Sequence, residues 1–284
     1  MSEWRTELRV GVVRMEGTDA VELLNRLSTN DVSNLSKSMT KDTLLVNNQG
    51  KLIDWIRAHC IDASTIQLIT TEHRAKSVAD WIERYTIMED CETRVVGESV
   101  SLWRWCCSEA AEIVSDEGLA SMPTPRGFPD GIDSLEARLV DISERTPTIG
   151  ASEFDHLRIS FGIPGAATEY PVPVNPLELR LAGSAISFSK GCYIGQEVLS
   201  RMDSYDKVSR YLMGWTGRDD DIRVSLESRL ISNGKRVGRI TSATPDGTRG
   251  LAILNRDVAS PRTLTLRTDS REWEVELVDL PFWS

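Results

Sequence analysis

The stretch KGCYIGQE, residues 190–197, combines a thiol, two glycines, a cation, an amide and a carboxylate. A packed helix or strand does not require that mixture. Gly191 and Gly195 allow backbone torsions and close approaches that other residues resist. The run therefore predicts a sharp turn that leads into a helix beginning near Gly195, with Cys192 just before the helix N-terminus.

The thiol of Cys192 has two interpretations. The partial positive charge of a helix N-terminus and the neighbouring Lys190 favour the thiolate, which makes Cys192 a reactive or ligand-contacting group. Alternatively, Cys192 is a small packing residue. One thiol cannot hold an iron–sulfur cluster alone, because a cluster needs about four ligands. Gln196 and Glu197 either fix the loop by hydrogen bonds or, for Glu197, stabilise the first helical turn.

Composition and charge restrict the class of protein. The chain has 284 residues, 40% of them hydrophobic, and a formal net charge of −10. This acidic balance argues against stable nucleic-acid binding, although a local basic groove is compatible with it. The start lacks a secretory signal pattern and no run has the roughly 20 apolar residues of a membrane span, so we expect a cytoplasmic protein without membrane contact. The five cysteines and three histidines are scattered, which predicts no metal site.

The hydrophobic pattern predicts two domains. Over residues 1–210, strands alternate with helices at 18–31 and 72–87, and residues 41–62 have the pattern of a hairpin, so we expect an α+β body. Over residues 211–284 the segments are short and alternating. Asn233-Gly234 is a strong hairpin signal, and this part is expected to form a small antiparallel β-barrel.

Six stretches of the chain carry recognisable motifs: LLNRLSTND (23–31), NNQGKLID (47–54), LRISFGIP (157–164), KGCYIGQEV (190–198), GKRVGRITSA (234–243) and RGLAILNR (249–256). Together they resemble the YgfZ/GcvT family of folate-binding proteins. The resemblance implies interleaved ferredoxin-like sub-domains around a central folate channel, with the C-terminal β-barrel beside them. Its branches are the T-protein of the glycine cleavage system, folate-dependent demethylases and YgfZ-like iron–sulfur maintenance proteins.

The resemblance also implies roles for individual residues. Arg158 would meet the glutamate tail of tetrahydrofolate, because guanidinium binds carboxylates bidentately. Two further roles come from the residues themselves. Glu169, in the loop after GIP, would accept from pterin N–H groups if it is buried, and Asp54, in an otherwise apolar strand, would hold a proton or a ligand amine if it faces a cavity. Each of two residues also has an alternative without a ligand: Arg158 as a cation on the surface of a helix, and Asp54 as an outward-facing residue of a strand. The further expected folate contacts are Asn47, Lys190, Gln196 and Glu197, with Cys192 and Asp54 as the catalytic candidates.

Two departures separate this chain from the T-protein branch. That branch has a pair of aspartates after the hairpin glycine, whereas this chain reads Ile53-Asp54-Trp55 and keeps only the first acid. The turn that carries a pterin-binding glutamate in the T-protein is matched only by RGFPD (residues 126–130), which lacks the glutamate and ends at Asp130. Both changes disfavour aminomethyl transfer and favour the YgfZ-like branch.

We therefore expect a tetrahydrofolate-binding protein that supports assembly or repair of iron–sulfur enzymes, with folate and iron–sulfur client proteins as partners. The enzyme alternative is tetrahydrofolate-dependent aminomethyl or methyl transfer. A third reading is an accessory of nucleic-acid modification, against which the net charge argues.

Overall fold

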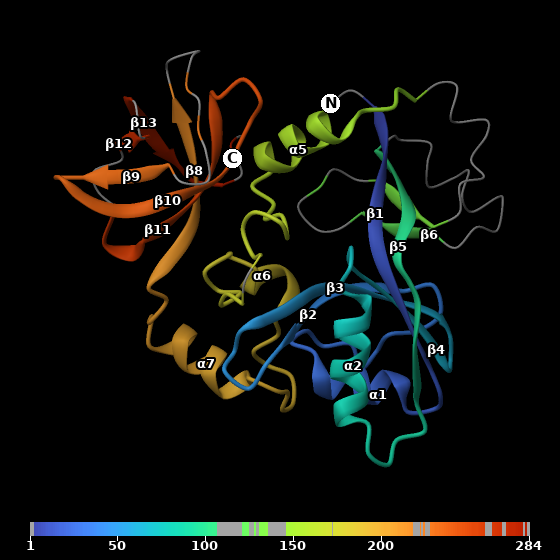
Figure 1. Cartoon of the computed structure of the whole chain (residues 1–284). Coiled ribbons are helices and arrows are strands. Elements are labelled where there is room, and N and C mark those ends of the chain that lie inside the picture. The colour runs from blue at the N-terminus through green and yellow to red at the C-terminus, as the bar shows by residue number, and fades with distance from the viewer. Residues whose placement is uncertain are drawn as a thin grey trace. The chain divides into compact units, whose positions relative to one another are not determined.

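A computed structural model describes residues 3–106, 121–124, 128, 131–135, 146–171, 173–217, 222, 224, 228–258, 263–268, 271–280 and 282 (Figure 1). The chain forms two compact units, each built from two stretches of sequence. Unit 1 comprises Met1–Gly150 and Ala182–Ser200, and unit 2 comprises Ala151–Leu181 and Arg201–Ser284. The sequence-based division used a single boundary at residue 210. Cys107 and Asp130 lie outside the described residues.

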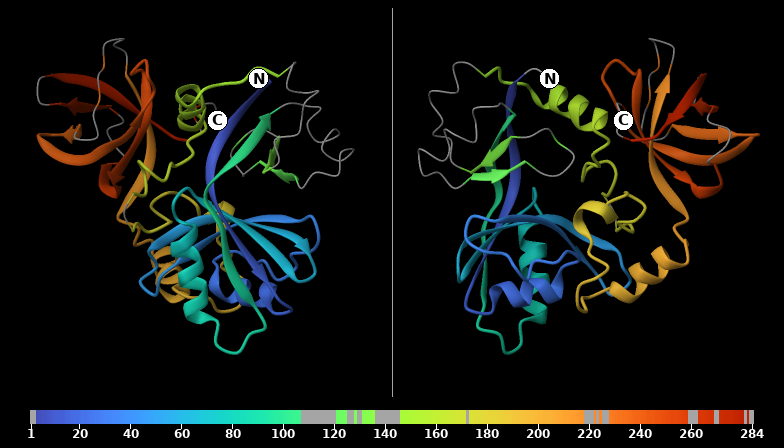
Figure 2. Two further views of the ribbon diagram at one scale, coloured as in Figure 1. Left: turned by 45° about the vertical axis from the view of Figure 1, so that its right-hand side comes forward. Right: turned by 180° about the vertical axis from the view of Figure 1, so that it is seen from behind.

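Unit 1 is built on a seven-stranded sheet in the order β2-β3-β4-β1-β5-β7-β6, with every neighbouring pair antiparallel. The strands are β1 (Trp4–Glu16), β2 (Thr40–Val46), β3 (Leu52–Asp62), β4 (Thr65–Thr71), β5 (Glu92–Cys106), β6 (Ser121–Pro123) and β7 (Ile132–Ser134). The long strands β1 and β5 run side by side (Figure 2). The helices are α1 (Ala20–Leu27), α2 (Ala75–Tyr85), α6 (Ala182–Ala185) and α7 (Gln196–Ser204), the last of which continues into unit 2.

The core of unit 1 lies between α1, α2 and one face of the sheet. Alternation along β3 sends Ile56 and Ala58 into this core, whereas Trp55 and Arg57 point to the opposite face. The helices present apolar residues at helical spacing, as predicted. Their buried residues are Ala20, Leu23, Leu24 and Leu27 in α1, and Ala75, Val78, Ala79, Trp81 and Ile82 in α2.

Unit 2 is a closed antiparallel barrel in the strand order β10-β11-β8-β13-β12-β9. Its elements are α5 (Ala151–Ser160), β8 (Arg210–Gly217), β9 (Arg229–Ser232), β10 (Lys235–Ala243), β11 (Arg249–Asn255), the 3₁₀ turn η1 (Arg256–Val258), β12 (Thr263–Arg267) and β13 (Glu272–Val278). Asn233 and Gly234 connect β9 to β10 with φ of 49° and 74°, the left-handed conformation that a two-residue hairpin turn requires. Helix α5 packs against β10 and β11.

The α+β class and the C-terminal antiparallel barrel are thus confirmed. Trp215 and Leu266 lie in the barrel core without any exposed surface, which shows that the alternating pattern of the tail reflects a closed interior. In the described part of the chain, no helix combines the length and the apolar character that a bilayer crossing demands.

Candidate functional site

Lys190 fastens the loop of residues 190–195 to the end of α1. Its Nζ donates to the carbonyl oxygens of Asn25, Ser28 and Asn30 at 2.6, 2.9 and 2.7 Å. Carbonyl groups at the C-terminal end of a helix lack helical partners and attract cations. Burial lowers the pKa of Lys190 to about 8, so the charged form still predominates at neutral pH. All three N–H groups of the ammonium are used within the protein.

Gly195 anchors the other end of the loop to the turn between β2 and β3. It has φ of 81°, and a Cβ there would lie 2.5 Å from the carbonyl oxygen of Asn47. Only glycine allows both that conformation and that approach. The Asn47 side-chain oxygen accepts from the backbone N–H groups of Gln49 and Lys51 at 2.9 and 3.0 Å. Asn47 therefore shapes the turn against which the loop of residues 190–195, here called the signature loop, packs.

Between these two anchors the loop leaves Cys192 exposed. The next residue, Tyr193, is buried, and burial raises the pKa of its hydroxyl to about 12. Helix α7 then begins at Gln196, as the sequence predicted, and Glu197 lies in its first turn. The side-chain amide of Gln196 closes the loop weakly, with Nε2 3.5 Å from the carbonyl oxygen of Lys190. The loop is a fixed support for an accessible thiol.

Lys190→Met is expected to lower the free energy of unfolding by about 1.5–3 kcal/mol, the range for hydrogen bonds made by a charged group. The three carbonyls at the C-terminal end of α1 lose their donor, and residues 190–195 lose an anchor. Chemical denaturation measures the first effect, and amide hydrogen exchange of the loop measures the second. Lys37→Met, at an exposed lysine of unit 1, is the control. Unchanged loop protection in Lys190→Met would contradict this role.

Asp54 is completely buried and already hydrogen-bonded. One carboxylate oxygen accepts from the backbone N–H of Thr71 at 2.8 Å and the other from its hydroxyl at 2.7 Å. Arg74 lies 3.6 Å away. Burial raises the pKa of the Asp54 carboxyl, and the Thr71 hydrogen bonds oppose that shift. Asp54 joins β3 to the segment before α2, so its oxygens reach a ligand only if these bonds break.

Arg158 and Glu169 lie in unit 2, where they bind each other. The five N–H groups of Arg158 all have partners within that unit. Asp155 accepts twice at 2.7 Å, the Ile163 carbonyl accepts at 2.7 Å, and Ser242 of β10 accepts at 3.1 Å. The remaining N–H reaches Glu169 at 3.0 Å. A folate carboxylate would have to displace one of these acceptors, so the predicted clamp role of Arg158 stays a prediction.

Glu169 is equally occupied. It has no exposed surface, and it accepts from the Gly165 N–H at 2.7 Å and from the hydroxyls of Thr168 and Ser242 at 2.6 and 2.5 Å. With Arg158, these groups tie the segment after α5 to the barrel. The structure therefore brings Arg158 and Glu169 together as a structural pair, and their contact with folate remains a prediction.

Two buried donors were not singled out as ligand contacts by the sequence. The indole N–H of Trp55 and the hydroxyl of Tyr193 have no hydrogen-bond partner among the described residues. Buried polar groups normally have partners, so each of these two donors is available to a ligand atom or a water molecule. Tyr193 lies within the stretch of residues 190–198 that carries the family resemblance, and Trp55 comes directly after the stretch of residues 47–54. In the sequence, the signal that could have indicated Trp55 as a ligand contact was its place directly after Asp54, where the T-protein branch has a second acid.

A buried ion cluster lies on the face of the unit 1 sheet opposite α1 and α2, the face to which Arg57 points. Asp133 of β7 accepts from Arg104 of β5 through two bonds of 2.7 Å, and from Arg57 of β3. Arg57 also donates to the carbonyl of Pro123 in β6. The Arg104 guanidinium lies 4.4 Å from the ring centroid of Phe128. This cluster ties β5, β6 and β7 to β3, the strand that carries Asp54 and Trp55.

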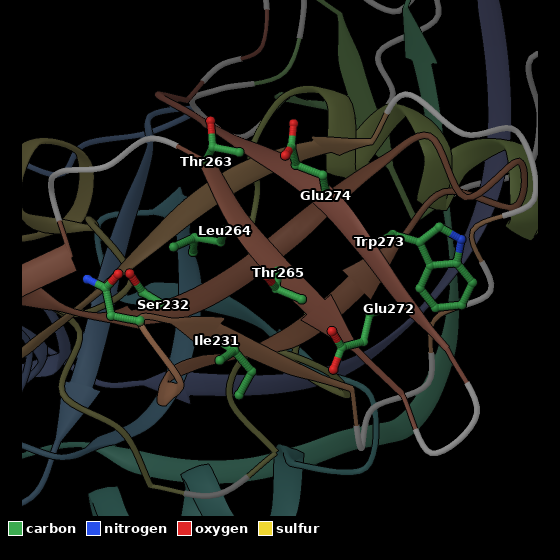
Figure 3. A pocket seen from close by; sticks show the side chains of 9 residues that line it. Ile231, Ser232, Thr263, Leu264, Thr265, Glu272, Trp273 and Glu274 are labelled. Carbon is green, nitrogen blue, oxygen red and sulfur yellow. The ribbon is translucent and has the colours of Figure 1, made fainter.

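Two cavities that the described residues line both belong to unit 2. One, of about 430 Å³, lies on the outside of the barrel over β9, β12 and β13 (Figure 3). The other, of about 350 Å³, is lined by residues that include Arg180, Met213 and Leu277. Neither of the two is lined by a predicted folate contact.

Comparison with known proteins agrees with these motifs. The family model of the GCVT N-terminal domain matches residues 9–116. The tRNA-modifying protein YgfZ of Yersinia enterocolitica is 30% identical over 50% of this chain and 44% of its own length. The iron-sulfur cluster assembly factor IBA57 homolog of Mycosarcoma maydis is 27% identical over 67% of this chain and 51% of its own. An aminomethyltransferase of Staphylococcus carnosus is 23% identical over 87% and 77%.

A solved structure has a similar fold. The glycine cleavage system aminomethyltransferase T from Bartonella henselae superposes with a TM-score of 0.80, covering 99% of this chain and 86% of that one. At 17% identity this likeness concerns the fold alone. The domain match, the similarity to YgfZ and IBA57 proteins and the shared fold agree with one another. Residues 9–116 match the GCVT N-terminal domain, and the chain is similar to proteins of the YgfZ/GcvT-like family.

Proposed function

We propose that the protein binds tetrahydrofolate and supports the assembly or repair of iron–sulfur enzymes. The observation that carries the proposal is the signature loop, which holds Cys192 exposed between the Lys190 and Gly195 anchors. Asp54, the other catalytic candidate, is buried with both oxygens occupied. The group that can meet a partner is therefore the thiol. Similarity to an iron-sulfur cluster assembly factor supports the same reading.

Folate fits the two unpartnered donors. A pterin ring carries nitrogen and oxygen acceptors, and Trp55 and Tyr193 offer a buried N–H and a buried O–H. With its raised pKa, Tyr193 keeps its proton at neutral pH and can donate. Tetrahydrofolate would supply one-carbon chemistry when bound. The protein's own contribution is to bind and orient it near the signature loop.

Tyr193→Phe is expected to weaken tetrahydrofolate binding by about 0.5–1.5 kcal/mol, the contribution of one neutral hydrogen bond. Titration calorimetry on the full chain measures this. Tyr205→Phe is the control, because Tyr205 is 68% exposed and removing its hydroxyl leaves no buried group unpaired. An unmutated protein that shows no heat of binding with tetrahydrofolate, with or without a one-carbon unit, would refute the folate half of the proposal.

Cys192 is expected to react with an alkylating reagent at least about tenfold faster than the buried Cys60 and Cys106 at pH 7, because accessibility controls thiol reactivity. Burial also raises the pKa values of Cys60 and Cys91. Mass spectrometry of the labelled peptides gives the rates.

Cys192→Ser should leave the melting temperature nearly unchanged and abolish rescue of iron–sulfur enzyme activity in a deletion strain. A Cys192→Ser protein that rescues fully would show that the loop acts through its backbone. A large fall in melting temperature would show a packing role instead.

Aminomethyl transfer is the second candidate, supported by similarity to aminomethyltransferases. Against it, Trp55 stands where that branch has its second acid, and Asp54 is held by Thr71. Incubation with an aminomethyl-lipoyl carrier and tetrahydrofolate should therefore release little ammonia. Turnover of about 1–10 per second, typical of enzymes, would promote this candidate over the first.

A further inference from the structure

A row of arginines crosses three neighbouring strands on the outside of the barrel. Arg239 of β10 lies directly opposite Arg229 of β9, which lies directly opposite Arg267 of β12. Residues paired in this way point to the same face, with Cβ atoms about 4.5–5.5 Å apart. Leu230 and Leu266, the chain neighbours of Arg229 and Arg267, lie in the barrel core. The arginine row therefore faces outward.

Most of this positive charge is not neutralised within the protein. Arg267 pairs with Glu272, the next residue along the row in β13. Among the residues that the structure describes, Arg229, Arg236 and Arg239 have no ion pair or hydrogen bond through their guanidinium groups. Like charges directly opposite each other destabilise a sheet. The row therefore costs folding stability that a bound anion would offset.

The spacing of the row matches a ligand with several negative charges. Neighbouring strands lie about 4.7–4.9 Å apart, so the three arginines cover about 10 Å, beyond the reach of a single phosphate. Exposed Arg236 lies opposite Ile231 and extends the positive surface along β10. Guanidinium groups bind phosphates in a bidentate manner, which makes a polyphosphate backbone the best match.

The side chains that line the groove beside the arginine row indicate which kind of polyphosphate would bind. Thr265 lies opposite both Ile231 and Glu274, so this groove of about 430 Å³ adjoins the arginine row on its next register position (Figure 3). Its polar side chains are hydroxyls, an amide and carboxylates, contributed by Ser232, Asn233, Thr263, Thr265, Glu272 and Glu274. Carboxylates repel phosphate but accept hydrogen bonds from hydroxyl groups. The ribose 2′-OH is such a group, and it is what distinguishes RNA from DNA.

We propose that the arginine row and the adjoining groove bind RNA, with phosphates on the row and ribose hydroxyls in the groove. Trp273, the aromatic residue of the groove lining, is 8% exposed and packs in the barrel core. The recognition therefore depends on the backbone and is independent of base sequence. The expectation of no stable nucleic-acid binding came from the net charge of −10, which does not reveal a local basic face.

Fluorescence anisotropy of the full chain with a short labelled RNA hairpin tests this proposal. Arg229→Ala/Arg239→Ala should raise the Kd about tenfold or more. Between about 50 and 200 mM salt, the slope of log K against log salt should become shallower by about 1.5, since each phosphate contact contributes about 0.7–0.9. The control Lys37→Ala/Arg84→Ala removes the same charge at exposed positions of unit 1 and should change the Kd little.

A DNA hairpin of the same sequence tests the choice of RNA. DNA should bind more weakly, and Glu274→Gln should reduce that difference by removing the repulsion from DNA phosphates. Equal affinity for both nucleic acids, or equal loss in the row and control variants, would overturn the proposal. Absence of RNA binding at low salt, or binding to anionic lipid vesicles without RNA binding, would overturn it too. None of these outcomes depends on folate binding.

Discussion

Arg158→Met is expected to lower the free energy of unfolding by about 3–5 kcal/mol, the cost of removing one partner from a buried ion pair. The variant leaves Glu169, which has no exposed surface, without its cation. It also removes the donors to Asp155, the Ile163 carbonyl and Ser242, and so loosens α5 from β10. Chemical denaturation of the full chain measures the loss.

Two comparisons separate this structural role from a folate clamp. Arg256→Met, at a half-exposed arginine paired with Asp206, should cost below about 1 kcal/mol. Arg158→Met/Glu169→Gln should recover part of the lost stability, because the stranded carboxylate is neutralised. A stable Arg158→Met protein that binds tetrahydrofolate about 1.5–3 kcal/mol more weakly would instead restore the clamp interpretation.

Local features of the fold were predictable because they depend on neighbouring residues. The spacing of Leu24 and Leu27 predicted α1, and Asn233-Gly234 predicted the β9–β10 turn. Gly195 likewise marked the turn before α7, because glycine alone fits its positive φ next to the Asn47 carbonyl. These signals act over a few residues, and the sequence shows them directly.

The partners of the polar site residues were not predictable in the same way. Lys190 binds carbonyls about 160 positions earlier in the chain, and Arg158 binds Ser242 84 positions later. Residue type and spacing show that a cation is present, but they do not show which acceptor the fold brings to it. The sequence therefore assigned Lys190, Arg158 and Asp54 to an external ligand, whereas the structure gives each of them internal partners. The arginine row is another such case, since only strand register brings its members together.

Removal of the Asp133 carboxylate should destabilise unit 1 about as strongly as removal of the Arg158 guanidinium destabilises unit 2. Asp133→Ala is expected to lower the free energy of unfolding by about 3–5 kcal/mol, because it leaves Arg57 and Arg104 without their shared carboxylate. The two guanidinium groups belong to residues only 7% and 4% exposed, so water cannot replace the lost partner without local opening. Thermal and chemical denaturation both measure the change.

Asp133→Ala should also affect tetrahydrofolate binding, because the ion cluster of Asp133 joins β7 to β3, the strand that carries Trp55. Arg57 lies two positions after Trp55 on β3, and Asp133 comes three positions after the end of the RGFPD stretch in the sequence. Loss of the cluster should therefore weaken tetrahydrofolate binding as well as stability, although Asp133 itself has no proposed contact with folate. Asp80→Ala, which removes a carboxylate from an exposed pair with Lys76, is the matched control and should change neither quantity appreciably. If Asp133→Ala lost stability but kept full folate affinity, measured below its unfolding transition, the cluster would support the sheet alone and the folate contacts would lie elsewhere.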